Sequence, residues 1–158
     1  MKHNALRETI ATALPELARD PERLAMWIEK GRIRSPMTDS RGFEWEYTLN
    51  IMVQDFTAHP SILFLTINDW LRVNQPELLQ PGGKSGYQFE VDVIDDATVD
   101  LHVWLDLTER VHVTANDDGS DNLQHEDEQA NLLPDDLRGA NLQRLLMDDV
   151  LILPVTDE

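Results

Sequence analysis

The chain has 158 residues and no cysteine, so we expect one domain with a sizeable core and exclude disulfides, thiolate zinc sites and cysteine nucleophiles. Its net charge of −17, from 30 acidic residues against 13 lysines and arginines, argues against direct nucleic-acid recognition, which needs a cationic surface. The sequence starts without the apolar run of a signal peptide, and no apolar stretch approaches the ~20 residues that span a bilayer. A soluble protein made in the cytoplasm, without membrane association, is predicted.

The first third of the chain predicts a helix followed by a strand hairpin. Asn4 is a suitable N-cap for a helix that ends near Leu14. In residues 23–33 the apolar side chains alternate, and Glu29-Lys30-Gly31-Arg32 resembles a turn. These features favour a strand and hairpin over a second helix beginning at Asp20-Pro21-Glu22.

Residues 43–54 show the clearest strand pattern in the chain. Every odd position is large and apolar, and every even position is polar except Met52. Because successive side chains of a strand point to opposite faces, this pattern predicts a long strand with one buried, aromatic-rich face.

The best helix signal follows at Pro60, whose fixed φ suits a first helical turn after Thr57 or His59. Pro76 ends the segment. One stripe with a 3.6-residue period is apolar and consists of Ile62, Leu63, Ile67, Trp70 and Leu71.

Two further strands, residues 87–93 and 99–107, carry apolar side chains at odd positions and are expected to bury them. An antiparallel pairing that keeps odd opposite odd places Val93 against Val99, with a short connection between them. Residues 110–114 continue as a short strand. The predicted fold class is therefore α+β, with a mainly antiparallel sheet packed by helices.

The character of the chain changes after residue 115. Residues 116–158 contain 12 acids and 2 bases. We therefore expect three parts: a core over residues 1–115, an acidic flexible linker over 116–134, and a C-terminal arm over 135–158. The arm is predicted to be an amphipathic helix to about Met147, followed by a short apolar segment.

The polar face of the predicted sheet holds the candidate ion sites. The pairing places Asp92 opposite Asp100 and Glu90 opposite His102, which suggests either a cation site, a surface for a cationic partner, or a solvated face that discourages strand addition. His102 and His112 are candidate ligands on neighbouring strands, but no third ligand is spaced to complete a metal site.

The sequence contains no hydrolase elbow, metalloprotease helix or dinucleotide fingerprint. We therefore expect neither an enzyme nor a cofactor. Two apolar residues, Met52 and Trp104, interrupt the polar face and suggest an interface. On the predicted arm, the candidate interface residues are Leu137, Leu142, Leu145 and Leu146.

Residues 6–113 resemble the phage tail completion family, the R protein of contractile-tailed temperate phages. The segments that carry the resemblance are 14–17, 20–24, the Gly31 turn, 47–50, 55–56, 58–60, and above all Trp70-Leu71-Arg72-Val73-Asn74-Gln75-Pro76-Glu77-Leu78-Leu79 and Leu107-Thr108-Glu109-Arg110-Val111. The resemblance covers roughly the first 115 residues and leaves the acidic tail outside the common core.

The resemblance implies a structural protein that completes the tail at its head-proximal end and prepares head–tail joining. It implies a tail-terminator-like homo-oligomeric ring, commonly sixfold, that meets other tail and head-connector proteins. The protein is then expected in the host cytoplasm during assembly and in the virion tail afterwards. No active-site residues carry over. Folding or contact roles are expected for Trp70, Leu71, Arg72, Glu109 and Arg110.

One alternative comes from the acidity of the chain. A small, very acidic phage-type protein suits a DNA-mimicking inhibitor that blocks a host nucleic-acid-binding protein. Such an inhibitor needs carboxylates arrayed at phosphate-like spacing. Concentration of the acids in a tail, rather than along helices, counts against this alternative.

Overall fold

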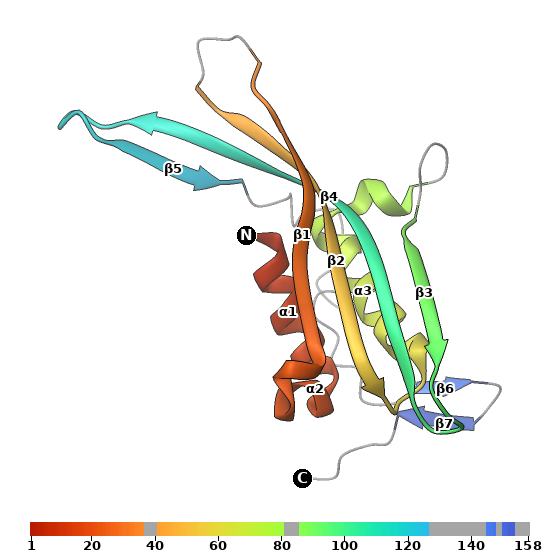
Figure 1. The fold of residues 1–158 in the computed structure, drawn as a ribbon. Helices are drawn as coiled ribbons and strands as arrows, with labels where there is room; N and C mark the ends of the chain where they lie inside the picture. Colours follow the sequence, from red (N-terminus) through yellow and green to blue (C-terminus); the bar gives the residue numbers. More distant parts are fainter. Residues whose placement is uncertain (37–40, 81–85, 127–144, 148–149, 154–158) are drawn as a thin grey trace.

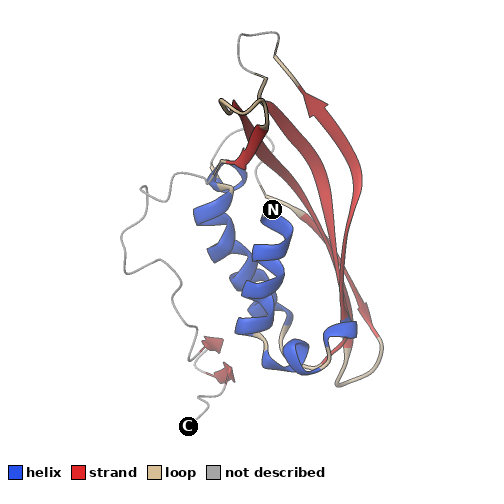
Figure 2. Cartoon of the chain, turned by 90° about the vertical axis from the view of Figure 1, so that its left-hand side faces the viewer, coloured by secondary structure: helices blue, strands red, loops and turns tan. Residues whose placement is uncertain are grey.

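The protein is a two-layer structure in which helices cover one face of an antiparallel sheet (Figure 2). The computed structural model describes residues 1–36, 41–80, 86–126, 145–147 and 150–153. The predicted α+β class with a mainly antiparallel sheet is confirmed. None of the helices in these residues is long and apolar enough to cross a bilayer.

In the described residues, the helical layer is built from three α-helices and two short 3₁₀ turns: α1 (Lys2–Ala13), α2 (Pro15–Arg19), η1 (Pro21–Arg23), α3 (Pro60–Asn74) and η2 (Pro76–Leu79). The predicted cap at Asn4 is wrong, because α1 already begins at Lys2 and has Met1 at its N-cap position. His59 does cap α3, since its Nδ1 accepts the Ser61 N–H at 3.2 Å.

The main sheet has five strands: β1 (Leu24–Arg34), β2 (Phe43–Phe56), β3 (Gln88–Val93), β4 (Val99–Ala115) and β5 (Asp121–His125). The order is β1-β2-β4-β3, and β5 also pairs with β4. β3 pairs with residues 99–104 of β4 and β5 with residues 111–115, so the two short strands share one edge of β4 (Figure 1).

The expected hairpin turn at residues 29–32 does not occur, because β1 runs through these residues as one strand. The pairing between β1 and β2 shifts register between Ile28 and Gly31. Such a β-bulge takes up an extra residue without ending the strand, and it explains why a turn-like sequence lies inside a strand. The C-terminal half of β1 is exposed.

The register predicted for β3 and β4 is confirmed, with Val93 opposite Val99 and Phe89 opposite Val103. The expectation that both strands bury their odd positions holds for β4 but fails for β3. Phe89 is 54% exposed and Val93 is 74% exposed, whereas Val103 is fully buried. β3 lies at the margin of the sheet, where the helices give it little cover (Figure 1).

The chain beyond residue 109 also differs from expectation. Residues 110–114 are not a separate strand but continue β4. β5 forms a hairpin with β4 inside the segment expected to be a flexible linker. Leu145–Met147 form β6, which pairs with β7 (Val150–Leu153). The predicted helix was expected to end at about Met147, so a strand replaces its last turn. The division into three parts remains a prediction.

The core lies between the sheet and the helices and matches the predicted apolar stripes. The odd positions of β2 and the stripe of α3 are buried together with the apolar face of α1. The largest fully buried side chains are Phe56, Leu6, Ile10, Leu17, Leu49, Ile51, Ile62, Leu63, Ile67, Leu71, Leu101 and Leu105.

Two valines on adjacent strands, Val103 in the core and Val93 at an exposed position, test this arrangement. We expect Val103→Ala to lower the free energy of unfolding by about 2–3 kcal/mol, because it removes two buried carbons and leaves a cavity. Val93→Ala, at an exposed position, is expected to change it by no more than about 0.5 kcal/mol. Urea unfolding followed by circular dichroism measures both. Equal losses would contradict the assignment of β3 as an open edge.

Candidate assembly surfaces

A buried carboxylate, Glu109 on β4, is the centre of a polar network on the helix-covered face. Its side chain is 4% exposed. One oxygen accepts the backbone N–H of Lys2 at 3.1 Å and the hydroxyl of Tyr47, and the other lies 3.1 Å from Nδ1 of His125. Burial, together with the hydrogen bond to Glu109, raises the pKa of the Tyr47 phenol, so it stays protonated and donates.

The network continues through Gln75, the residue at the C-terminal end of α3. The Lys2 ammonium donates to its Oε1 at 2.7 Å, and Thr108 N–H donates to the same oxygen at 3.2 Å. Its Nε2 donates to Thr108 Oγ1 and to Glu77, each at 2.9 Å. Gln75 thus provides a hydrogen-bond acceptor for the Thr108 N–H, in the part of β4 that pairs with neither β3 nor β5. Both oxygens of Glu109 are engaged, so this centre fastens elements together and exposes no reactive group.

The opposite face of the sheet carries no helix in the described part of the chain and holds an aromatic cluster (Figure 2). The His102 ring lies 3.9 Å from Trp104 and 5.5 Å from Trp27, measured between centroids. His102 Nε2 lies 2.9 Å from Asn50 Oδ1, which can only accept, so this nitrogen carries the proton. We call Trp27, Asn50, Met52, His102 and Trp104 the outer-face cluster.

The strand registers explain why these side chains gather. Trp27 pairs with Asn50, and Asn50 pairs with Trp104, so the three form one row across the sheet. Met52 pairs with His102 in the adjacent row. Met52 and Trp104 are partly exposed. The structure thus places Met52 and Trp104 together on the open face; their role as an interface remains a prediction.

Sequence reasoning missed Trp27, the most exposed indole of this cluster at 41%. The signal was present, because Trp27 alternates with Leu24, Met26 and Ile28 and therefore belongs to the opposite face of a strand. The turn expected at residues 29–32 hid the strand's full length and its pairing with β2.

The candidate interface leucines of the C-terminal arm are placed only in part. Leu145 and Leu146 lie in β6, not in the predicted helix. Leu137 and Leu142 lie outside the described residues. These four positions therefore remain predictions.

The residues expected to take folding or contact roles from the resemblance divide into two groups. Trp70 and Leu71 are buried in α3, and Glu109 is the buried network centre. Arg72 and Arg110 are exposed and form ion pairs, with Asp69 at 3.9 Å and with Glu44 at 3.0 Å.

The candidate metal ligands do not come together. His102 and His112 both lie on β4, ten residues apart in one strand, which separates them by roughly 33 Å. Asp92 and Asp100 are paired as predicted, but Asp100 accepts the Asp55 N–H at 2.8 Å. Among the residues that the structure describes, no group of three histidines or carboxylates is arranged to hold a metal ion.

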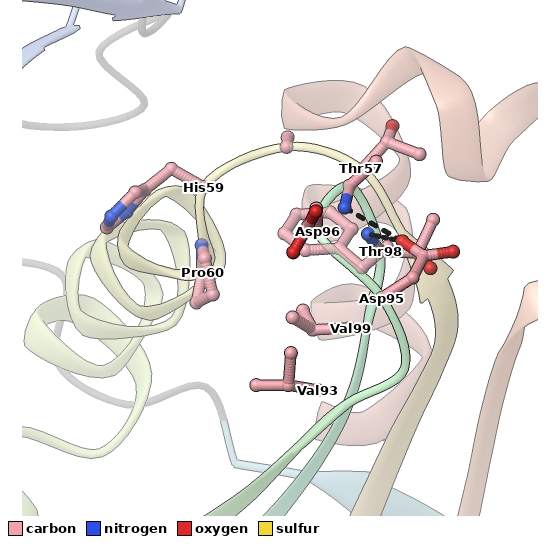
Figure 3. A pocket seen from close by; sticks show the side chains of 11 residues that line it. Thr57, His59, Pro60, Val93, Asp95, Asp96, Thr98 and Val99 are labelled. Carbon is pink, nitrogen blue, oxygen red and sulfur yellow. Dashed lines mark hydrogen bonds between the residues drawn. The ribbon is translucent and has the colours of Figure 1, made fainter.

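A groove of about 530 Å³ lies between the β2–α3 connection and the β3–β4 turn (Figure 3). Its polar side chains have local structural roles. Asp95 accepts the N–H groups of Ala97 and Thr98, each at 2.8 Å, and His59 caps α3. Val93 and Val99 supply apolar surface. Because these polar groups are engaged in turn and cap hydrogen bonds, the groove does not indicate a reaction.

Sequence comparison identifies the family of this two-layer protein. Residues 1–129 match the family described as P2 phage tail completion protein R (GpR). The chain belongs to this family. The tail completion protein R of Escherichia phage P2 is 35% identical over 119 residues, which cover 74% of this chain and 77% of that relative. No solved structure matches the fold.

The family match changes where the common core is expected to end. It continues past residue 115 and includes the whole of β5, which the resemblance had left in the acidic tail. The R family consists of structural tail proteins, so the expectation of a DNA-mimicking inhibitor finds no support.

The β3–β4 turn provides a pH test. Two backbone N–H groups favour the charged form of Asp95 and lower its pKa below the ordinary value of 3.8. The turn therefore gains stability from Asp95 above the unfolded pKa and loses it as the pH falls through the folded pKa. We expect the stability difference between wild type and Asp95→Ala to be constant above pH ~5 and to shrink in acid. An NMR titration that puts Asp95 above 3.8 would contradict this assignment.

Glu109→Gln tests the buried network. The amide keeps the size of the side chain but loses one acceptor oxygen, so a buried donor is left without its partner. We expect a loss of about 1–3 kcal/mol in the free energy of unfolding. The matched control is Glu90→Gln on exposed β3, with an expected change within about 0.5 kcal/mol. Chemical denaturation measures both, and an unchanged Glu109→Gln would refute a fastening role for the network.

Proposed function

We propose that this R-family protein completes the phage tail at its head-proximal end as a tail-terminator-like ring of identical copies, sixfold as is common for such rings. It acts structurally, without a catalytic step. The observation that carries the proposal is the family match over residues 1–129, together with the 35% identity to a tail completion protein. The protein assembles in the host cytoplasm and stays in the virion tail.

The two faces of the sheet suit a structural role. One face is sealed by helices, and the other presents the outer-face cluster to its surroundings (Figure 2). Partly exposed tryptophans next to acidic side chains favour a partner surface that combines apolar and cationic groups. Glu29, Glu90 and Asp106 supply the carboxylates around the cluster on the same face.

We assign this face to contact with a neighbouring tail or head-connector protein. Tryptophans in the centre of a patch are typical anchors of protein interfaces, and surrounding polar groups exclude water from them. The predicted C-terminal arm, an amphipathic helix and a short apolar segment within residues 135–158, is a second candidate contact with these neighbours.

The experiment uses a phage that lacks the gene for this chain, supplied with the protein from a plasmid. Trp27→Ser is expected to lower the yield of infective particles at least about tenfold, because an interface tryptophan contributes 1.4 kcal/mol or more. The matched control is Ile28→Ser. Ile28 is 39% exposed against 41% for Trp27, but it points to the other face of the same strand.

Circular dichroism checks that both variants fold, and electron microscopy shows whether tails without heads accumulate. Equal yields from the two variants would refute the outer face as a contact. Failure of the wild-type protein to restore infective particles would refute the tail completion role itself.

A further inference from the structure

Three strands, β1, β3 and β5, each leave one edge unpaired in the described part of the main sheet. β1 forms one end of the strand order, and β5 pairs with β4 on one side only. Both extend beyond the helices, as the β4–β5 hairpin and the distal ends of β1 and β2 show (Figure 1). A free edge presents rows of N–H and C=O groups that pair readily with another strand. The edges of β1 and β5 are therefore available for strand addition beyond the helical layer.

The two edges carry opposite charge. Residues 30–34 of β1 contain Lys30, Arg32 and Arg34 and no acid, although the whole chain has only 13 lysines and arginines. The β4–β5 turn, residues 116–121, contains three aspartates and no base; Asp121 forms an ion pair with Arg41, which leaves Asp117 and Asp118 as the acidic side chains of the turn. Glu46 contacts both arginines of β1, at 4.0 and 2.6 Å, and one carboxylate cannot neutralise three cations. Glu44 lies opposite Arg34 but pairs with Arg110, so residues 30–34 form a locally basic segment in a strongly acidic protein.

Each edge also exposes one large aliphatic side chain. Ile33 on β1 is 58% exposed, and Leu123 on β5 is 57% exposed. Ile33 pairs with Trp45, and Leu123 pairs with Val113, so the two side chains lie on the same face of the sheet as Glu109. Strands that come together with these residues opposite would cover both.

We infer that the acidic β5 edge of one copy adds to the basic β1 edge of the next copy, with Leu123 beside Ile33. The inference rests on the proposed ring and names the contact that builds it. Because the two surfaces differ, the contact is heterologous, and repetition closes a ring when the rotation permits. Repulsion between like charges disfavours pairing of β1 with β1 and of β5 with β5.

The absence of cysteine makes a direct test possible. Ile33→Cys and Leu123→Cys are prepared separately as full-length chains with C-terminal tags of different mass. The two variants are mixed and treated with a short bismaleimide, both as pure proteins and in lysates of cells that assemble tails. Both side chains are exposed, so the substitutions are expected to leave the fold intact.

We expect a cross-linked pair that contains one chain of each variant. Either variant alone should give little product, because identical edges do not meet. Strong cross-linking of one variant with itself would overturn the heterologous contact, as would the absence of a mixed product from both preparations.

A charge exchange supplies the second test. Arg32→Glu and Asp117→Lys are introduced separately, and each is expected to lower the mixed cross-link at least about threefold. A chain that carries both substitutions restores opposite charges between neighbouring copies, so its cross-link should recover. Failure of the double variant to recover while it stays folded would overturn the charge pairing.

The same proteins separate this inference from the proposed function. If wild type restores infective particles but the mixed cross-link never forms, the edge contact is wrong and the tail completion role stands. If the cross-link forms but wild type restores no particles, the contact is supported and the assigned function falls.

Discussion

One buried carboxylate holds the layers of this protein together. Glu109 accepts a backbone N–H at the start of α1 and the Tyr47 hydroxyl from β2, and it lies beside His125 of β5. Gln75 extends the network from the end of α3 to the backbone of β4. A charge buried to this extent is costly unless every lone pair finds a donor, so the positions of these elements depend on one another. The network thus connects the helical layer to the β4–β5 hairpin, which extends beyond that layer.

This dependence divides the long strands into two regions. Between residue 99 and Glu109, the odd positions of β4 and their partners on β2 meet helices and form the core. On the other side of Glu109 the sheet continues past the helices, and Ile33 on β1 and Leu123 on β5 remain exposed. A 17-residue strand is much longer than the helices require, since the mean strand has about 5–6 residues. The extra length has no use in the core and instead displays backbone edges and side chains away from it.

Much of the sheet could be predicted from the alternation of apolar and polar residues at odd and even positions. The alternation in β2 and the odd-to-odd register of β3 and β4 needed no tertiary information. The failures have physical causes. A bulge directly precedes Gly31, and a local pattern does not distinguish such a bulge from a turn. β5 pairs with β4 at exposed positions and is held in addition by His125 beside Glu109, so its sequence lacks the apolar alternation that marks a half-buried strand.

The candidate surfaces were predictable to the same degree as the strands that carry them. Met52 and Trp104 stood out because their strands had been recognised, whereas Trp27 was hidden with β1. Glu109 is different in kind. A charged residue at an inward position of an alternating strand already conflicts with the pattern, and such a conflict is a signal for a buried network. Its partners come from residues 2, 47 and 125, which only the folded chain brings together.

The charge distribution connects the fold to assembly. A chain with a net charge of −17 repels its own copies, which keeps exposed apolar edges from random association before assembly. The same repulsion must be overcome locally wherever copies meet. Three cations within five residues of an edge strand provide such a place, whereas an even spread of the 13 would not. The excess of acid and the small basic edge are therefore two parts of one arrangement. In the proposed ring, general repulsion suppresses unspecific contacts, and the basic segment of β1 is the place where identical copies would join.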